Sequence, residues 1–191
     1  MIRFRNAALA GLTAGLLILH AAASTADIAH RKFARIEEGR LAPGTRLYLS
    51  AAELNAWAAD EAQMYAPGAA RDIKLQLADG AATGSMLVDF VKLRQAATGE
   101  QAGWLMKNLF AGERQVTVTA RFESGNRRAR VDVERVEVSG VPIEGATLDF
   151  LIQNWLRPTF PDVKADQWFD LGFRIERFTV SPGGVLVVIG K

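Results

Sequence analysis

Histidine and cysteine, the side chains behind much nucleophilic and metal-assisted catalysis, are nearly missing from this sequence. Its 191 residues include no cysteine, and the two histidines are His20 and His30. Both precede the part of the chain that we expect to fold, so Ser-His-Asp triads and histidine-built zinc sites are excluded there. Thiol catalysis and thiolate metal sites are excluded as well. The sequence also contains no phosphate-binding glycine-rich motif with its lysine and no G-x-S-x-G nucleophile motif.

Carboxylate groups are the remaining candidates for acid–base chemistry. The adjacent pair Asp60/Glu61 lies in a predicted helix, where it is more typical of a solvent-exposed face. Asp162, Asp166 and Asp170 lie in a predicted loop, and their spacing matches no EF-hand calcium pattern. We therefore predict no catalytic residue, no metal site, no cofactor and no enzymatic activity. A carboxylate-dependent hydrolase remains an alternative, which would need two acids facing each other in a cleft.

The N-terminus has the composition of a secretory signal. Arg3 and Arg5 form a basic start, residues 7–19 carry no charge, and Ala21-Ala22-Ala23 supplies an A-x-A cleavage signal. A membrane-spanning helix needs roughly 20 apolar residues, and this run is shorter. We predict a signal peptide over 1–23, with an uncleaved anchor at 7–23 as the alternative. Either way the chain is exported and is periplasmic or extracellular.

The charge balance argues against nucleic acid as a partner. The chain carries 23 Lys+Arg and 21 Asp+Glu, and loss of Arg3 and Arg5 with the signal leaves 21 of each. A neutral domain gives poor grounds for a surface that follows phosphates. The one basic cluster, Arg127, Arg128 and Arg130, sits in a Ser-Gly-Asn-Arg-Arg context that favours a solvated hairpin tip.

Three helical windows and a polar spacer organise the rest of the chain. Residues 24–45 form the expected spacer, and a single domain is expected over 46–191. Ser50 and Glu53 form a capping box that opens the first helix, which Pro67-Gly68 ends. Residues 100–110 and 148–155 show helical apolar spacing, and the latter window stops at Pro158.

Period-two alternation predicts antiparallel strands elsewhere. Strands are expected before and after a turn at Asp79-Gly80, the second over residues 85–93. Two hairpins follow, turning at residues 124–126 and 181–184. The apolar alternation changes phase at Glu134-Arg135 and again at Glu176-Arg177, as a β-bulge does, and bulges bend sheets. The predicted fold is α+β, with a strongly curved antiparallel sheet wrapped around or packed on amphipathic helices.

The apolar residues suggest what such a domain binds. Hydrophobic residues make up 49% of the chain, and several predicted strands are apolar on both faces, which requires a second apolar layer. A sheet with a buried, dry centre is one solution, and a groove that accepts acyl chains is the other. An aromatic residue off the core stripe of a helix, as Trp104 is, can also sit at a membrane surface. The candidate lining residues are Leu54, Trp57, Trp104, Met106, Leu151 and Trp155.

Two segments resemble a known family. The segment Leu-Ser-Ala-Ala-Glu-Leu-Asn-Ala-Trp (residues 49–57) and the later Val-Ser-Gly-Val-Pro-Ile (residues 138–143) are similar to exported proteins with a half-tubular lipid-binding (TULIP-like) fold, among them LmeA-like and YpmS-like proteins. The resemblance runs in order of elements from Arg46 to the C-terminus. The helical window at 100–110 is an insertion relative to that pattern. The resemblance implies a long helix cradled by a coiled antiparallel sheet, with lipid-facing side chains between them.

The leading functional prediction is therefore an extracytoplasmic lipid-binding protein that holds a phospholipid or another acyl lipid in an apolar groove and that can meet a membrane surface. An envelope scaffold or interaction protein with the same fold and a dry core is the first alternative. The two differ in whether a lipid-accepting surface exists.

Overall fold

The protein is described from a computed structural model that covers residues 23–65, 67–98, 112–145, 148 and 167–191. The structure is α+β, as predicted, and its sheets are antiparallel. In chain order the elements are α1 (Thr25–Glu37), β1 (Arg46–Ser50), α2 (Ala51–Tyr65), β2 (Ala70–Ala78), β3 (Ala81–Asp89), α3 (Phe90–Thr98), β4 (Glu113–Gly125), β5 (Arg128–Val138), β6 (Val141–Pro142), β7 (Phe169–Asp170), β8 (Ile175–Ser181) and β9 (Gly184–Ile189).

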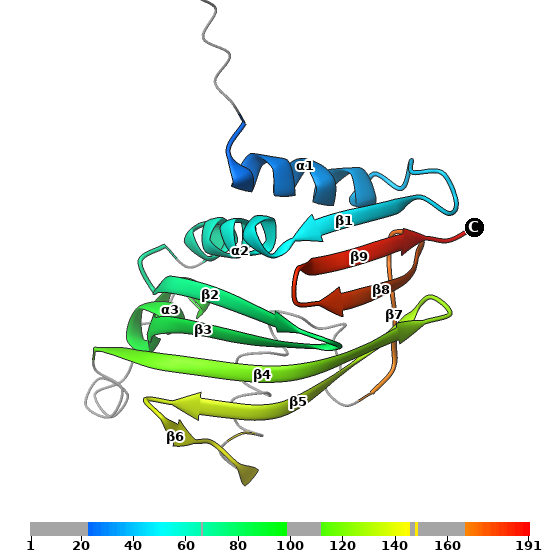
Figure 1. Cartoon of the computed structure of the whole chain (residues 1–191). Coiled ribbons are helices and arrows are strands. Elements are labelled where there is room, and N and C mark those ends of the chain that lie inside the picture. Colours follow the sequence, from blue (N-terminus) through cyan, green and yellow to red (C-terminus); the bar gives the residue numbers. More distant parts are fainter. Residues whose placement is uncertain (1–22, 66, 99–111, 146–147, 149–166) are drawn as a thin grey trace, which may run out of the picture.

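The strands form two sheets rather than the single sheet that the sequence suggested. The smaller sheet has three strands in the order β1-β9-β8. The larger has six, in the order β2-β3-β4-β5-β6, with β7 pairing the start of β5, and it does not close on itself. Figure 1 shows α1 and α2 along the upper side of the molecule, with the long strands β4 and β5 crossing below them.

Helix α1 corrects the prediction of a polar spacer over 24–45. Ser24 and Asp27 form a reciprocal capping box at its start, and Ala29 and Ile36 are buried. Phe33 packs on Trp57 of α2 with ring centroids 4.5 Å apart. The three apolar residues recur at helical spacing, so they face one side and dock on α2 and β1. The same helix carries His30 into the folded body, where the sequence analysis placed no histidine.

Helix α2 begins where its capping box predicted. The Ser50 hydroxyl accepts from the Glu53 amide, and the Glu53 carboxylate accepts from the Ser50 amide. The helix ends at Tyr65, just before the predicted Pro67-Gly68 stop. Asn55 then joins α2 to the edge of β2, because its side chain accepts from the Leu75 amide and donates to the Leu75 carbonyl.

The predicted strand over 85–93 is wrong in its second half. Strand β3 ends at Asp89, and α3 starts at Phe90. The Asp89 carboxylate accepts from the amides of Val91 and Lys92, so it caps the first turn of the helix. That capping competes with the apolar alternation and ends the strand. The predicted helix at 100–110 lies outside the described residues, and of the window 148–155 only Leu148 is described.

Both predicted β-bulges are confirmed. The β4–β5 ladder pairs Thr119 with Arg135 and Ala120 with Val133, so Glu134 is the extra residue. The β8–β9 ladder pairs Ile175 and Arg177 with consecutive residues of β9, so the extra residue there is Glu176. Each bulge restores the phase of the alternation, which keeps the apolar residues before and after it on one face of the sheet.

One packed cluster joins the helices to the smaller sheet. Leu49 is 2% exposed, and the cluster contains Ile36, Leu47, Leu49, Leu54, Val187 and Ile189. The two sheets meet where β8 lies beside the hairpin turns of the larger sheet. The Ser124 hydroxyl accepts from the Phe178 amide and donates to the Phe178 carbonyl, and the Gly80 amide donates to Val180.

Candidate functional site

The six-stranded sheet has one face that is apolar along three neighbouring strands. The registers place Val116, Val118 and Ala120 of β4 opposite alternate residues of β3 on one side and of β5 on the other. Phe122 of β4 lies opposite Val131 of β5. We call these residues, their partners in β3 and β5, and Val88, which follows Met86 in the same alternation opposite Arg114, the valine face. Its members are Ala82, Gly84, Met86, Val88, Val116, Val118, Ala120, Phe122, Val131, Val133, Val136 and Val138.

The opposite face of the same strands is polar. Its residues alternate with those of the valine face, and the Thr83 and Thr119 hydroxyls lie 3.0 Å apart on it. Arg135 pairs with Glu137 on this side, and Arg121 donates to Glu134 at 2.8 Å. The polar face can therefore be exposed to water, whereas the valine face requires contact with another apolar surface.

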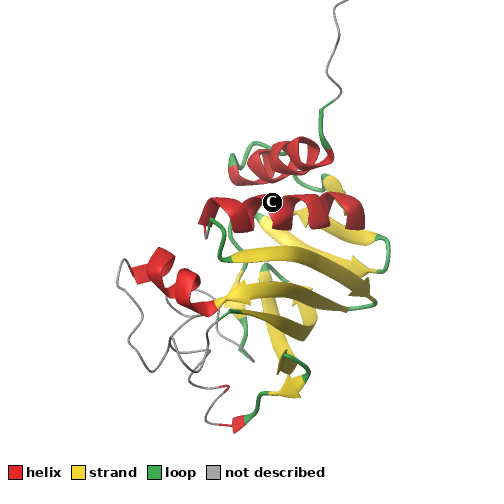
Figure 2. Cartoon of the chain, turned by 90° about the vertical axis from the view of Figure 1, so that its left-hand side faces the viewer, coloured by secondary structure: helices red, strands yellow, loops and turns green. Residues whose placement is uncertain are grey.

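Helix α2 and strand β8 cover only part of the valine side of the sheet. Helix α2 packs on β2, whose Leu75 and Leu77 join the edge of the packed cluster. At the other end, Phe122 meets Phe178 of β8 edge to face, with centroids 6.3 Å apart. Most large side chains between these contacts are half-buried: Met86, Val116, Val118, Val131, Val133 and Val138. Figure 2 shows the larger sheet below the two N-terminal helices.

The predicted lining residues fall into two groups. Leu54 is 8% exposed and belongs to the packed cluster, and the ring of Trp57 lies against Phe33. Both therefore hold α2 in place, and neither is among the residues of the valine face. The remaining four, Trp104, Met106, Leu151 and Trp155, lie outside the described residues.

The residues of the valine face were not among the predicted lining residues. The signal was in the sequence, because Val116, Val118, Val131 and Val133 alternate in the clearest hairpin of the chain. The predicted strand over 85–93 would carry Leu87, Val91 and Leu93 on its second face. Only Leu87 lies there, opposite Gln115, because Val91 and Leu93 belong to α3.

The most buried ion pair of the described residues links α1 to the start of α2. The Lys32 ammonium lies 2.6 and 2.8 Å from the two carboxylate oxygens of Glu53 and also donates to the Tyr48 carbonyl at 2.7 Å. The Glu53 side chain is 11% exposed and that of Lys32 is 27% exposed. Burial raises the pKa of Glu53, but hydrogen bonds from Lys32 and Ser50 outweigh it, so the pKa of this carboxyl lies below its ordinary value.

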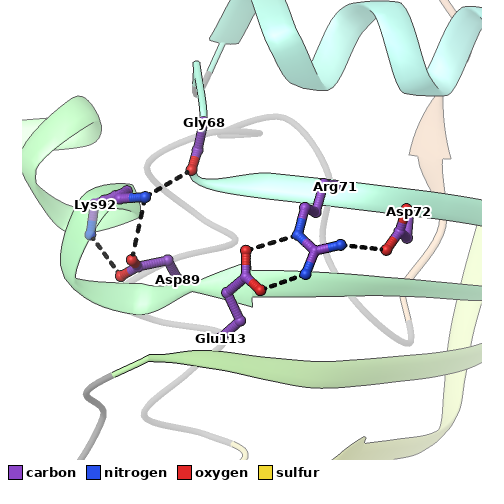
Figure 3. A network of polar contacts seen from close by, with 6 residues as sticks. All are labelled: Gly68, Arg71, Asp72, Asp89, Lys92 and Glu113. Carbon is purple, nitrogen blue, oxygen red and sulfur yellow. Dashed lines mark hydrogen bonds and ion pairs between the residues drawn. The ribbon is translucent and has the colours of Figure 1, made fainter.

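A second charged network ties together the ends of three strands (Figure 3). Arg71 of β2 reaches across β3 to Glu113 of β4 with two hydrogen bonds of 2.6 and 2.7 Å, and it also contacts Asp72. These bonds lower the pKa of Glu113. Lys92 lies 3.6 Å from Asp89 and 3.5 Å from the Gly68 carbonyl. Each carboxylate in this network has a cationic partner, so its geometry suits strand alignment rather than acid–base chemistry.

The other predicted carboxylates are also paired or partly outside the described residues. Asp60 contacts His30 of α1 at 2.7 Å, and Glu61 lies 3.8 Å from the same ring. Asp170 lies 3.7 Å from Arg128, whereas Asp162 and Asp166 are outside the described residues. The described ranges contain no group of three or more potential metal ligands.

Comparison with known proteins gives no relative from which a role could be transferred. No family model matches the chain, and neither does any curated protein or solved structure. No helix within the described ranges is long and apolar enough to cross a membrane. Any functional assignment therefore has to come from the residues themselves.

Proposed function

We propose that this chain is an exported, non-catalytic lipid-binding protein that holds acyl chains against the valine face. The observation that carries the proposal is the valine face itself, which is apolar along β3, β4 and β5 and is half-buried rather than fully buried at most of its large side chains. Contiguous apolar surface of this kind is uncommon on soluble proteins, and it marks binding sites.

The dimensions of the face suit an acyl chain. From Val116 to Phe122 the strand advances six residues, which corresponds to roughly 20 Å at the rise of an antiparallel strand. The side chains along that length are Val, Ala and Phe, and they offer dispersion contacts without hydrogen-bond donors. A ligand that gains from such a surface is long and apolar, because each CH₂ group removed from water contributes about 0.8 kcal/mol.

The bulge in β5 supports the same proposal. Glu134 keeps all four valines of β5 on the valine face, and bulges increase the local twist and bend of a strand. A sheet bent toward its apolar side would form the half-tube that the resemblance to TULIP-like proteins implies.

Native mass spectrometry tests the proposal on the protein as an expressing cell exports it. The expected result is a co-purifying phospholipid or other acyl lipid, identified after extraction. A mass that is lipid-free both as purified and after incubation with phospholipid vesicles would contradict the proposal. The scaffold with a dry core would then become the leading account.

Two neighbouring residues of β4 make a matched pair for locating the lipid. Val118 lies on the valine face, and Thr119 lies on the polar face of the same strand; both are half-buried. We expect Val118→Gln to lower lipid occupancy and Thr119→Gln to leave it unchanged, in variants whose circular dichroism matches the parent. A photoactivatable fatty acid gives a second readout without any substitution. Its cross-links should map to β3–β5 peptides, and cross-links confined to the polar-face residues would count against the valine face.

A further inference from the structure

Two tight turns at one end of the molecule hold an arginine where glycine is favoured. The β4–β5 hairpin turns at Asn126-Arg127, with φ values of 52° and 62°. The chain before β8 turns at Phe173-Arg174, with φ values of 54° and 59°. Two successive positive φ values define a type I′ turn, for which Asn-Gly is the preferred sequence. Arginine at the second position is strained in both turns, and strained residues concentrate at functional sites.

The two turns lie side by side. The Arg127 amide donates to the Glu176 carbonyl at 2.9 Å, and the Arg127 carbonyl accepts from the Leu171 amide at 2.7 Å. The backbone of one turn therefore holds both ends of the segment that forms the other. Strand β7 continues this contact, since Asp170 pairs with Arg128. Figure 1 shows β7 beside the β4–β5 hairpin, next to β8.

Exposed aromatic side chains flank these arginines. Phe173 is 55% exposed, and Trp168 is 40% exposed. The Arg128 guanidinium donates to the Trp168 carbonyl at 3.3 Å, which fixes the tryptophan beside the hairpin tip. Trp168 and Arg128 also line a hollow of about 240 Å³ together with Ser124, Gly125 and Asn126. We call Arg127, Arg128, Trp168 and Phe173 the tip surface.

The charge of the tip surface is only partly neutralised. Arg71, Arg121 and Arg135 on the larger sheet are each paired with a carboxylate. Arg127, by contrast, has no ion pair among the described residues and is exposed. Arg177 of β8 is also exposed. Arg128 has one distant partner, Asp170, which is itself 92% exposed. The tip surface is thus cationic and aromatic in a chain whose net charge is only +2.

From this juxtaposition we propose that the tip surface docks the protein on an anionic phospholipid membrane. Tryptophan and phenylalanine partition to the boundary between head groups and acyl chains, and arginines close to an anionic surface are attracted to it. The proposal rests on the lipid-binding function proposed above and adds to it the place where the protein meets the bilayer. The valine face ends at this place, since Phe122 and Ser124 lead directly into the hairpin turn.

The test is co-sedimentation of the exported protein with vesicles of phosphatidylcholine alone and of phosphatidylcholine with phosphatidylglycerol. We expect binding to the anionic vesicles and weak binding to the neutral ones. Arg127→Gly should weaken anionic-vesicle binding about fivefold, the value of one cation near such a surface. The same substitution should raise Tm, because glycine fits φ 62° without strain. A merely structural role for Arg127 predicts no loss of vesicle binding.

Two further variants sharpen the result. Arg31→Gln removes an exposed charge from α1 and serves as the control for net charge. Phe173→Ser should weaken binding to both vesicle types. In vesicles with brominated acyl chains, tryptophan fluorescence should be quenched on binding, and Trp168→Phe should abolish the part of this quenching that comes from the tip surface. Equal affinity for both vesicle types, or equal losses in Arg31→Gln and Arg127→Gly, would overturn the docking surface. Tighter binding to a single-stranded oligonucleotide than to anionic vesicles would overturn it in favour of nucleic acid.

Monomeric dihexanoyl phosphatidylglycerol separates this proposal from the lipid-binding function. If native mass spectra show uptake of this lipid but the protein does not bind vesicles, the docking surface is refuted and the lipid-binding function is retained. Vesicle binding that depends on Arg127 without any uptake of the monomeric lipid would refute the acyl-binding function and leave a membrane-docking protein.

Discussion

Replacing Lys32 by methionine should loosen the N-terminal helix from the rest of the protein. The substitution keeps most of the length of the side chain and removes the ammonium that bonds both oxygens of Glu53 and the Tyr48 carbonyl. Glu53 would keep only the hydrogen bond from Ser50 while remaining 11% exposed. Removing one partner of a fully buried pair costs about 3–5 kcal/mol, and an exposed pair contributes about 0–1 kcal/mol. The partial exposure of Lys32 places the expected loss at about 2 kcal/mol.

The loss should depend on pH with a definite sign. The pKa of Glu53 is lower in the folded state than its ordinary value of 4.5, so the pair stabilises the fold above that pH. The contribution is lost as the pH falls through the folded-state pKa. The difference between parent and Lys32→Met should therefore be largest near pH 7 and should shrink toward pH 3.

Urea unfolding at several pH values measures this difference directly, and Tm should fall by roughly 4–8 °C at pH 7. Arg31→Met, at the adjacent exposed position of α1, is the matched control and should change stability by less than about 0.5 kcal/mol. A difference that stays constant from pH 7 to pH 3 would refute the electrostatic reasoning and assign the loss to packing. A difference no larger than that of the control would show that solvent screens the pair.

Three further substitutions test how the elements are joined. Asn55→Ala leaves the amide and carbonyl of Leu75 without their partner and should cost about 2 kcal/mol in urea unfolding, with Asn55→Asp intermediate because its carboxylate accepts but cannot donate. Ser124→Ala removes both hydrogen bonds to Phe178; it should cost about 2 kcal/mol and speed amide hydrogen exchange in β8, and unchanged exchange would contradict the role of Ser124. Gly184→Ala places a Cβ in conflict with the Leu49 carbonyl and the Tyr48 ring, so Tm should fall with a loss of about 3 kcal/mol, and a neutral result would mean that β1 shifts freely.

Local rules predicted the elements whose signals lie within a few residues. The capping box at Ser50 and Glu53 and the two hairpins depend on neighbours in sequence. The first hairpin turns at Asn126-Arg127 rather than at the predicted residues 124–126, because Ser124 and Gly125 still pair with β5. The phase slip at Glu134 could also be recognised, because a bulge leaves a one-residue mark in the alternation. These local features were sufficient to predict the α+β fold class and the two hairpins.

Features set by distant contacts could not be predicted in the same way. Helix α1 was taken for a spacer because its large apolar residues are few, and only its packing on Trp57 and the Lys32–Glu53 pair shows why it is ordered. Asp89 ended β3 four residues early by capping α3. The candidate site shifted for a related reason. Helical stripes pointed to Leu54 and Trp57, whereas the assembled registers gather the valines of separate strands onto one face.

In three edge strands of this protein, a side chain from another element forms hydrogen bonds with backbone groups of the strand. The Tyr48 carbonyl of β1 is bonded by Lys32, the backbone of Leu75 in β2 by Asn55, and the backbone of Phe178 in β8 by Ser124. An unpaired strand edge is a template on which a second copy of the chain can add its own strand. Each of these side chains occupies backbone groups that such a copy would need. The connections that hold the helices and sheets together therefore also protect the protein from polymerising through its edges.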